Sequence, residues 1–442
     1  MKHRSVSTVA GVALVSMLAA GALTSCSAGD GGGESVGANN GGGAQSGGTV
    51  NVTLANHVWT DIIKEKIPEF ETLTGIKVEL TQLAEDQLTD QYKVKLNAGS
   101  SDMDVMMYRP LQEGKLFGKS NYFADLTQRV QSNAEWDWSD FQGGPVGLTT
   151  YQDKVVGVPI ITESEVLYYR RDLLEQAGLE VPTTLDELEA AAKAISEANP
   201  GIAGFVSRTG RSAAVTQLSG YLYSFGGEWI DDQGNSAVGS DEAKAAYAYY
   251  GGLLRNYGPD NLSTDMSWPE AFAIFSQGNA AFLTDASSLY KNTTDPEKST
   301  VSDKVGFAAF PAGPAGSRPY NVAAWGLGIN SASKNQDNAW KFIEWATSPE
   351  MTLAIQAAGV AGARTSAWED PAGTANLPAD LAKAVAANGA GGVGNDRPLV
   401  IGVAEAREIV GAPIVAAIVG DDSDAAADEA DAALQQLLDS ER

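Results

Sequence analysis

The alternation of strand-like and helix-like segments near the start of this 442-residue chain constrains its fold most. Residues 49–55, 76–80 and 104–108 are short, apolar and rich in β-branched side chains, which predicts three strands. Residues 61–72 and 83–98 lie between them and carry apolar residues at helical spacing. This order is typical of a mostly parallel sheet with helices on its faces, so we predict an α/β fold.

The same pattern continues through the rest of the chain. Pro68 lies inside the first predicted helix and could break it. Thr184 and Glu187 match a capping box, so a helix should begin at Leu185. The acidic tail beyond Asp421 should form a last helix whose leucines dock weakly. The further predicted strands are 155–159, 166–169, 306–310 and 324–329, and the further predicted helices are 171–177, 185–198, 241–256, 268–278 and 335–358.

The N-terminal segment has the features of an export signal. Lys2 and Arg4 precede an almost unbroken apolar run at residues 9–23. A helix that spans a bilayer needs roughly 20 residues, so this run is predicted to be the apolar part of a signal peptide. The run ends in Leu23-Thr-Ser-Cys26, which is similar to the lipobox of bacterial lipoproteins, where the cysteine is lipidated after cleavage.

The sequence therefore predicts a protein anchored outside the cell. We expect a lipoprotein signal peptide at 1–25 and lipidation at Cys26, the only cysteine in the chain. Residues 26–48 are rich in glycine and lack large apolar side chains after the cysteine, which predicts a flexible tether. The expected location is the extracellular face of the cell membrane, in a Gram-positive rather than a Gram-negative host.

Composition excludes several classes of function. The chain has 30 Lys and Arg against 56 Asp and Glu, a formal net charge of -26, which disfavours nucleic acid as a partner. One cysteine excludes an intramolecular disulfide and a cysteine zinc cluster. The two histidines, His3 and His57, exclude a metal site built from several histidines. We expect neither a metal nor a cofactor.

Motifs of known enzymes are mostly missing from the sequence. No GxSxG, HExxH, P-loop or EF-hand pattern occurs. Residues 389–394 match GxGxxG but follow a helix-like stretch instead of a strand, so we interpret them as a loop. Glu163 and Glu165 could act as the carboxylate pair of a glycosidase, although such pairs have little specificity in so acidic a chain. We predict that the protein is not an enzyme.

Aromatic and charged residues recur where predicted strands end. A sugar offers an apolar C–H face and a rim of hydroxyl groups, which aromatic rings and planar charged groups bind. In open α/β sheets such groups collect beyond the carboxyl ends of strands. The residues in such positions are Trp59, Tyr108, Arg109, Glu163, Arg208, Asp285 and Trp325.

Several segments, in the right order, resemble one family. Residues 67–78 (IPEFETLTGIKV), 96–105 (LNAGSSDMDV), 167–188 and 325–350 are similar to stretches of the extracellular solute-binding proteins, family 1, of ABC importers, the carbohydrate-binding type. Arg170 and Leu185 depart from the family's usual Asn and Trp, in stretches that are structural. The segments FPAGPAG and GARTS, which begin at Phe310 and Gly362, resemble the branch that takes sugar alcohols and small sugars.

The resemblance implies a two-lobe, periplasmic-binding-protein-like (type II) fold with the ligand in the cleft between the lobes. The first lobe is expected at 49–158 plus about 286–325, and the second at 159–285 plus about 326–442. Hinge closure on the ligand would prepare the protein, a monomer, for docking on the transmembrane permease.

The resemblance also implies which residues bind a small carbohydrate. Trp325 is the expected stacking ring, and Asp285, Arg208 and Arg364 are expected to bind hydroxyl groups. The full expected set is Asn56, Trp59, Glu85, Tyr108 and Arg109 from the first lobe, and Glu163, Arg208, Trp229, Asp285, Trp325 and Arg364 from the second lobe or the crossing segments.

The expected function is capture of a sugar, oligosaccharide or sugar alcohol for an ABC importer. Two alternatives stay open: a secreted glycoside-acting enzyme, and a binding protein of the same fold for a solute that is not a sugar.

Overall fold

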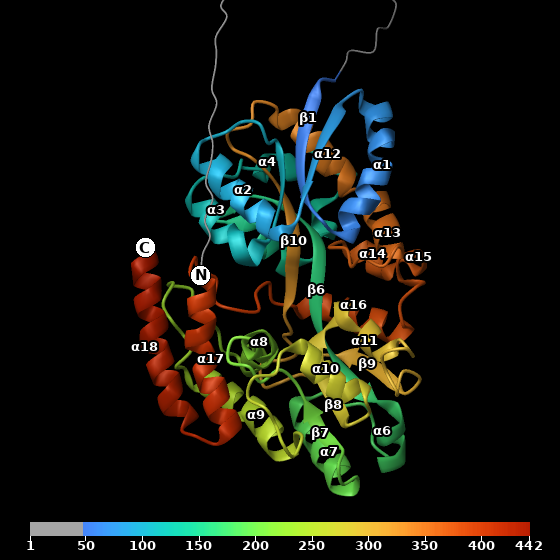
Figure 1. Ribbon diagram of the computed structural model, residues 1–442, viewed down its shortest axis with the longest axis vertical. Coiled ribbons are helices and arrows are strands. Elements are labelled where there is room, and N and C mark those ends of the chain that lie inside the picture. Colours follow the sequence, from blue (N-terminus) through green and yellow to red (C-terminus); the bar gives the residue numbers. More distant parts are fainter. Residues whose placement is uncertain (1–46) are drawn as a thin grey trace, which may run out of the picture. The chain divides into compact units, whose positions relative to one another are not determined.

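The computed structural model describes residues 47–442 (Figure 1). The predicted signal peptide, Cys26 and nearly all of the predicted tether lie outside the described residues. Within the described part, no helix is both long and apolar enough to cross a membrane.

The described chain alternates strands and helices, as the sequence predicted. The strands are β1 (Thr49–Ala55), β2 (Lys77–Leu83), β3 (Val105–Tyr108), β4 (Thr150–Tyr151), β5 (Lys154–Val155), β6 (Val158–Arg170), β7 (Ala203–Val206), β8 (Ala280–Ala286), β9 (Val305–Ala309) and β10 (Asn321–Ile329). The α-helices are α1 (Val58–Thr74), α2 (Glu85–Asn97), α3 (Lys115–Lys119), α4 (Thr127–Val130), α5 (Gly143–Leu148), α6 (Arg171–Ala177), α7 (Leu185–Ala198), α8 (Ala214–Phe225), α9 (Asp241–Tyr257), α10 (Trp268–Ser276), α11 (Lys291–Thr294), α12 (Gln336–Ala346), α13 (Pro349–Ala357), α14 (Thr365–Glu369), α15 (Pro371–Thr374), α16 (Ala379–Gly391), α17 (Val403–Val419) and α18 (Ser423–Glu441).

The main sheet is mixed, whereas the sequence predicted a mostly parallel one. Its strand order is β2-β1-β3-β10-β6-β8-β7, and β9 also pairs with β6. The pairs β1–β2, β1–β3 and β7–β8 are parallel. The long strands β6 and β10 are antiparallel to each other and to their other neighbours. They run from one parallel group to the other, so they are the segments that join the two halves of the sheet (Figure 1).

Two sets of buried side chains divide the described chain into two lobes. The first lobe is the core formed by residues from 50–161 and 325–363. The second lobe is formed by residues from 166–310 and 368–438, in two neighbouring clusters. The α/β fold with two lobes is therefore confirmed, and each lobe has its own core.

The division between the lobes differs from the expected one. Residues 326–363 lie in the first lobe because Leu327 of β10 pairs with Met107 of β3, and Phe342 of α12 is buried in the same core. Residues 301–310 lie in the second lobe because β9 pairs with the distal half of β6. The chain thus crosses between the lobes a third time, at 361–368, where Thr162 Oγ1 donates to the Gly362 carbonyl at 3.0 Å.

Local sequence signals explain where the elements begin and end. The capping box at Thr184 and Glu187 is present at the start of α7. The predicted helix 335–358 is two helices, since Ser348 caps α13 and Pro349 occupies its first turn. Pro68 lies inside α1 without ending it.

Other segments are more regular than the sequence suggested. The two strands predicted at 155–159 and 166–169 are parts of one 13-residue strand, β6. In α18, Leu434 and Leu438 are buried against the second lobe, so the last helix docks closely instead of weakly.

Candidate functional site

The side chains that carry the candidate site lie on one face of the β6–β10 ribbon. Trp325 pairs with Ile161, and Val322 pairs with Glu163. Residues directly opposite each other in a sheet share a face, as do residues two apart in one strand. The register shifts on both sides of Trp325, which marks a bulge at this position. Trp325 and Glu163 therefore lie on the same face, near the level at which the ribbon passes between the lobes.

A first-lobe group surrounds Trp325, whose side chain is almost entirely buried. The Arg109 guanidinium lies 5.8 Å from its ring centroid. Arg109 follows β3 and is held by Glu85 on α2, at 3.0 Å from Nη1, and by Glu113, which accepts from Nε at 3.1 Å. One side of the indole is thus already covered by a fixed cation. The residues Glu85, Arg109 and Trp325 are brought together as expected.

His57 completes this group from the N-terminus of α1. Its ring centroid lies 6.2 Å from that of Trp325, and its Nδ1 accepts a hydrogen bond from the backbone N–H of Trp59 at 3.0 Å. Burial lowers the pKa of His57, against the opposing charges of Glu85 and Asp61. The imidazole is therefore neutral near pH 7, with its proton on Nε2 as a donor.

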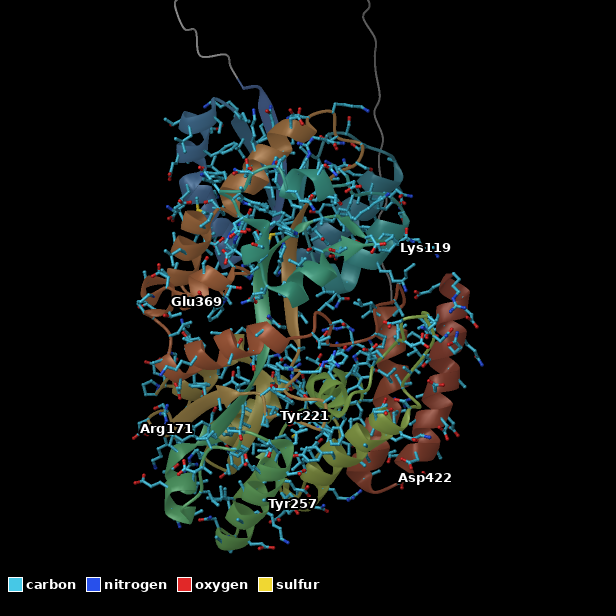
Figure 2. All side chains as sticks on the ribbon, turned by 180° about the vertical axis from the view of Figure 1, so that it is seen from behind. Lys119, Arg171, Tyr221, Tyr257, Glu369 and Asp422 are labelled. Carbon is cyan, nitrogen blue, oxygen red and sulfur yellow. The ribbon has the colours of Figure 1, made fainter. Side chains whose placement is uncertain are left out.

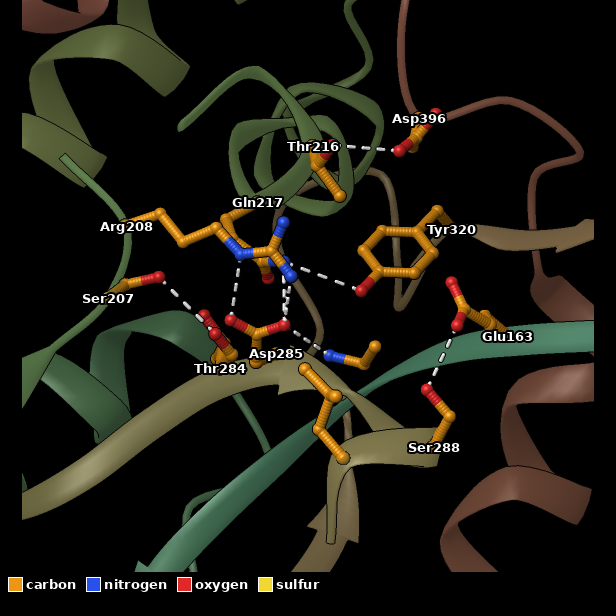
Figure 3. A network of polar contacts seen from close by, with 12 residues as sticks. Glu163, Ser207, Arg208, Thr216, Gln217, Thr284, Asp285, Ser288, Tyr320 and Asp396 are labelled. Carbon is orange, nitrogen blue, oxygen red and sulfur yellow. Dashed lines mark hydrogen bonds and ion pairs between the residues drawn. The ribbon is translucent and has the colours of Figure 1, made fainter. Parts of the chain in front are cut away.

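The second-lobe group centres on the ion pair of Arg208 with Asp285 (Figure 3). Arg208 follows β7, and its Nε donates to Asp285 Oδ2 at 2.9 Å while Nη2 donates to Oδ1. Asp285 lies at the end of β8 with no exposed surface and also accepts from Gln217 on α8 at 3.2 Å. Asp285 raises the pKa of Arg208 although burial opposes the charge, so the cation is fixed in one orientation.

Glu163 lies beside this ion pair on the shared ribbon face. Its Oε1 accepts from Ser288 Oγ at 3.0 Å, as Figure 3 shows. Burial raises the pKa of Glu163, the Ser288 hydrogen bond lowers it, and the charge of Asp396 raises it further. Among the described residues, the second oxygen of Glu163 accepts no hydrogen bond. The group is thus an acceptor with one oxygen available to a bound hydroxyl.

Three aromatic residues expected at the site lie inside the hydrophobic cores instead. Trp59 and Tyr108 are buried in the first lobe, and Trp229 is buried in the second. These three side chains keep 0–2% of their surface exposed, whereas Trp325, which belongs to the first-lobe core as well, keeps 6%. The same aromatic chemistry that binds sugars also fills cores, and the sequence alone did not separate the two uses. Asn56 is exposed directly before His57, next to the first-lobe group.

Arg364, which was expected to bind ligand hydroxyl groups, lies inside the first lobe. Its guanidinium has no exposed surface and donates to the Thr347 carbonyl at 2.8 Å and to the Trp136 carbonyl at 2.6 Å. It also pairs with Asp140 at 3.1 Å and lies over the Phe141 ring at 4.1 Å. All of these partners belong to the first lobe, so Arg364 holds that lobe together.

The structure adds polar residues that the sequence reasoning missed. Gln217 and Thr216 project from α8, and Tyr320 precedes β10. Asp396 and Arg397 come from the segment between α16 and α17 (Figure 3 includes Asp396). The sequence did contain a signal, since an Asp-Arg-Pro triplet follows the glycine-rich stretch that was interpreted only as a loop.

Comparisons with known proteins show the family to which the chain is similar. The family described as bacterial extracellular solute-binding protein matches residues 56–352. A mannitol-binding protein of Pseudomonas aeruginosa is 31% identical over 43% of this chain and 44% of its own length. The chain spans 44 to 69% of the length of four curated relatives that it matches.

Solved structures resemble nearly the whole described chain. A solute-binding protein of an ABC transporter from Agrobacterium radiobacter K84, in complex with ribitol, is 27% identical with a TM-score of 0.68, over 89% of this chain and 99% of the other. The maltose-bound MalE3 of T. maritima is 28% identical with a TM-score of 0.67, over 88% of this chain and all of the other.

Proposed function

Because the chain belongs to the bacterial extracellular solute-binding proteins, we propose that it captures a sugar or sugar alcohol and passes it, unchanged, to the permease of an ABC importer. The observation that carries this proposal is the shared face of the β6–β10 ribbon. On that face the Trp325 indole, flanked by Arg109, lies opposite Ile161, two residues before Glu163, and the ion pair of Arg208 with Asp285 is part of the polar network drawn with Glu163 (Figure 3). A polyhydroxylated ligand needs this combination of an aromatic surface, donors and an acceptor.

The names of the similar proteins support the choice of ligand class. Those names give mannitol, ribitol and maltose as ligands. The three crossing segments support hinge closure, since a few joining residues can absorb the rotation of two separately packed lobes. The ligand would then shift the population toward the closed form.

Direct binding measurements test the proposal. We expect isothermal titration calorimetry of residues 47–442 to show one-to-one binding of at least one of D-mannitol, ribitol, erythritol and maltose. The ligand should be recovered unchanged. Binding of L-arginine or spermidine without any sugar would favour the alternative of a non-sugar solute. Release of a hydrolysed glycoside would favour the alternative of an enzyme.

Replacing Glu163 with glutamine is expected to weaken binding of the sugar by about tenfold or more. The change removes a charged acceptor, and hydrogen bonds to charged groups contribute about 1.5–3 kcal/mol. The melting temperature should stay nearly the same, because Glu163 is only half-buried. The matched control is Glu197→Gln on the exposed end of α7, and equal affinities of the two variants would exclude Glu163 from the site.

Lys115 contacts the second lobe at a point outside the proposed ligand site, so it can be used to test closure of the lobes. Its Nζ, on α3 of the first lobe, donates to the Leu399 carbonyl at 2.9 Å and lies 3.5 Å from Glu441 of α18 in the second lobe. Lys119, labelled in Figure 2, also donates to the Glu441 carbonyl. The Glu441 carboxylate in turn accepts from the backbone N–H groups of Ile401 and Gly402 at 2.7–2.9 Å.

Lys115→Met is expected to weaken sugar binding a few-fold, up to about tenfold, although Lys115 is not proposed to touch the ligand. The variant loses contacts made only when these lobes meet, so a smaller fraction of molecules is closed. Calorimetry at low and high salt checks this, because the effect should shrink as salt screens the pair. An unchanged affinity at low salt would show that the contact does not favour closure.

We further propose that the chain is a monomer held at the outer face of the cell membrane by a lipid on Cys26. The lipobox-like Leu23-Thr-Ser-Cys26 and the glycine-rich stretch behind it support this anchor. Mass spectrometry of the N-terminal peptide from membrane-extracted protein tests it, since an unmodified Cys26 within a retained leader would exclude it.

A further inference from the structure

Two arginines of the second lobe are held in the same way. Arg208 donates from Nε and Nη2 to the two oxygens of Asp285. Arg397 donates from Nε at 2.5 Å and from Nη2 at 2.6 Å to the two oxygens of Asp396. In both pairs the aspartate occupies one edge of the guanidinium. Among the described residues, neither arginine has a hydrogen-bond acceptor at Nη1.

The second pair is anchored as firmly as the first. The Asp396 side chain is 3% exposed and accepts from Thr216 Oγ1, on α8, at 2.8 Å. Thr216 Oγ1 itself accepts from Arg407 Nη2, on α17, at 3.0 Å. Burial opposes the charged form, yet Arg397, Arg407 and the Thr216 hydroxyl lower the pKa of Asp396 to about 2. Asp396 is therefore a fixed anion, and it fixes the plane of Arg397.

Arg397 lies near the residues proposed above to bind the ligand. Asp396, which holds Arg397, accepts from Thr216, and the next residue of α8, Gln217, donates to Asp285, which holds Arg208. The two pairs therefore lie against the same part of α8 (Figure 3). The side chains of Arg208 and Arg397 keep 13% and 14% of their surface exposed. The Nη1 groups of Arg208 and Arg397 and the free oxygen of Glu163 are thus available to one bound ligand.

We infer that Arg397 is a ligand-contacting residue that, together with Arg208 and Glu163, binds a row of adjacent hydroxyl groups, with Asp396 as its positioning residue. This inference rests on the proposed function. Each Nη1 offers two N–H donors in a plane, which suits two neighbouring hydroxyl oxygens, and Glu163 accepts from a third. Because both cations are preoriented by buried aspartates, binding orders little of the site.

The test compares affinities for D-mannitol, ribitol and erythritol in the wild-type protein and in matched variants. We expect Arg397→Met and Arg397→Lys to lose about tenfold or more in affinity, since lysine keeps the charge but lacks the planar fork. The loss should be larger for D-mannitol, which has six hydroxyl groups, than for erythritol, which has four. Asp396→Asn should weaken binding in the same order of ligands. Arg211→Met, at an exposed arginine of the same lobe, is the control.

The outcomes separate this inference from the function on which it rests. Wild-type affinity in Arg397→Met, with binding still lost in Glu163→Gln, would overturn the role of Arg397 and leave the proposed function intact. Wild-type affinity in Arg397→Lys would show that only the positive charge at this position matters, and it would overturn the bidentate contact. Absence of binding of every probe by the wild-type protein would overturn the proposed function and this inference with it.

Discussion

Replacing Arg364 with methionine is expected to lower the free energy of unfolding by about 3–5 kcal/mol, the usual effect of removing one partner from a buried ion pair. The Arg364 side chain has no exposed surface, and its loss leaves Asp140 with only the Ser366 hydrogen bonds and removes the guanidinium donors from the carbonyl groups of Thr347 and Trp136. Removal of the guanidinium also uncovers the ring faces of Trp136 and Phe141. Urea unfolding, followed by tryptophan fluorescence, measures the change.

The matched control is Arg129→Met, which removes an arginine from the same lobe. Arg129 pairs with Asp337 at 2.7 Å, but the Asp337 side chain is 87% exposed, so the expected change is about 0–1 kcal/mol. At a temperature where Arg364→Met is folded, its affinity for sugar should equal that of the wild-type protein. Normal stability with lost sugar binding would contradict the structure and restore Arg364 to the ligand site.

Local patterns predicted many elements of the fold, although α8 and α17 were not among the predicted helices. The capping box before α7 and the alternating residues of β1 act within a few neighbours, so the sequence contains the whole signal. The lobe boundaries depend on pairings between distant segments, such as β10 with β3. No local pattern indicates that the chain stays in the first lobe after β10, through α12 and α13, and that part of the prediction differed from the structure.

The polar stretch Thr162–Glu165 shows why the site was only partly predicted. The predicted strands 155–159 and 166–169 leave these residues out. In the structure it is the middle of β6, where the strand crosses between the lobes and its side chains meet polar groups. A rule that finds strands by their apolar residues misses such a stretch, because its side chains are polar although most of them are buried.

The same ambiguity explains the residues that were placed wrongly. Trp229 and Arg364 have the chemistry of ligand groups, but each satisfies a buried environment in its own lobe. Asp285 and Arg208, by contrast, both follow predicted strands and do lie together, although the sequence did not predict the ion pair between them. Trp59 and Tyr108 also lie at predicted strand ends and yet belong to the first-lobe core, so a strand-end position alone did not separate binding from packing.

Glu165, two residues beyond Glu163 on β6, is a carboxylic acid whose burial is not offset by any polar contact among the described residues. It is fully buried, and neither carboxyl oxygen has a hydrogen-bond partner among the described residues. The carboxyl group packs against Gly220 of α8, where a larger residue would collide with it. Burial raises the pKa of Glu165 well above its usual range; the charges of Asp285 and Asp396 add to this, and Arg208 opposes it. The folded protein therefore holds Glu165 in its protonated, neutral form.

Glu165→Gln is expected to remove a pH dependence from the stability of the second lobe. The folded state keeps this proton at pH values where the unfolded chain, with a glutamate pKa of about 4.3, has lost it. Wild-type stability should therefore fall by about 1.4 kcal/mol per pH unit from about pH 5 up to the raised folded pKa, and the glutamine variant should not share this fall. Urea unfolding of both proteins at several pH values measures the difference, with Glu197→Gln as the exposed control. A difference that stays constant with pH would mean that Glu165 is ionised in the folded protein and has a charged partner there.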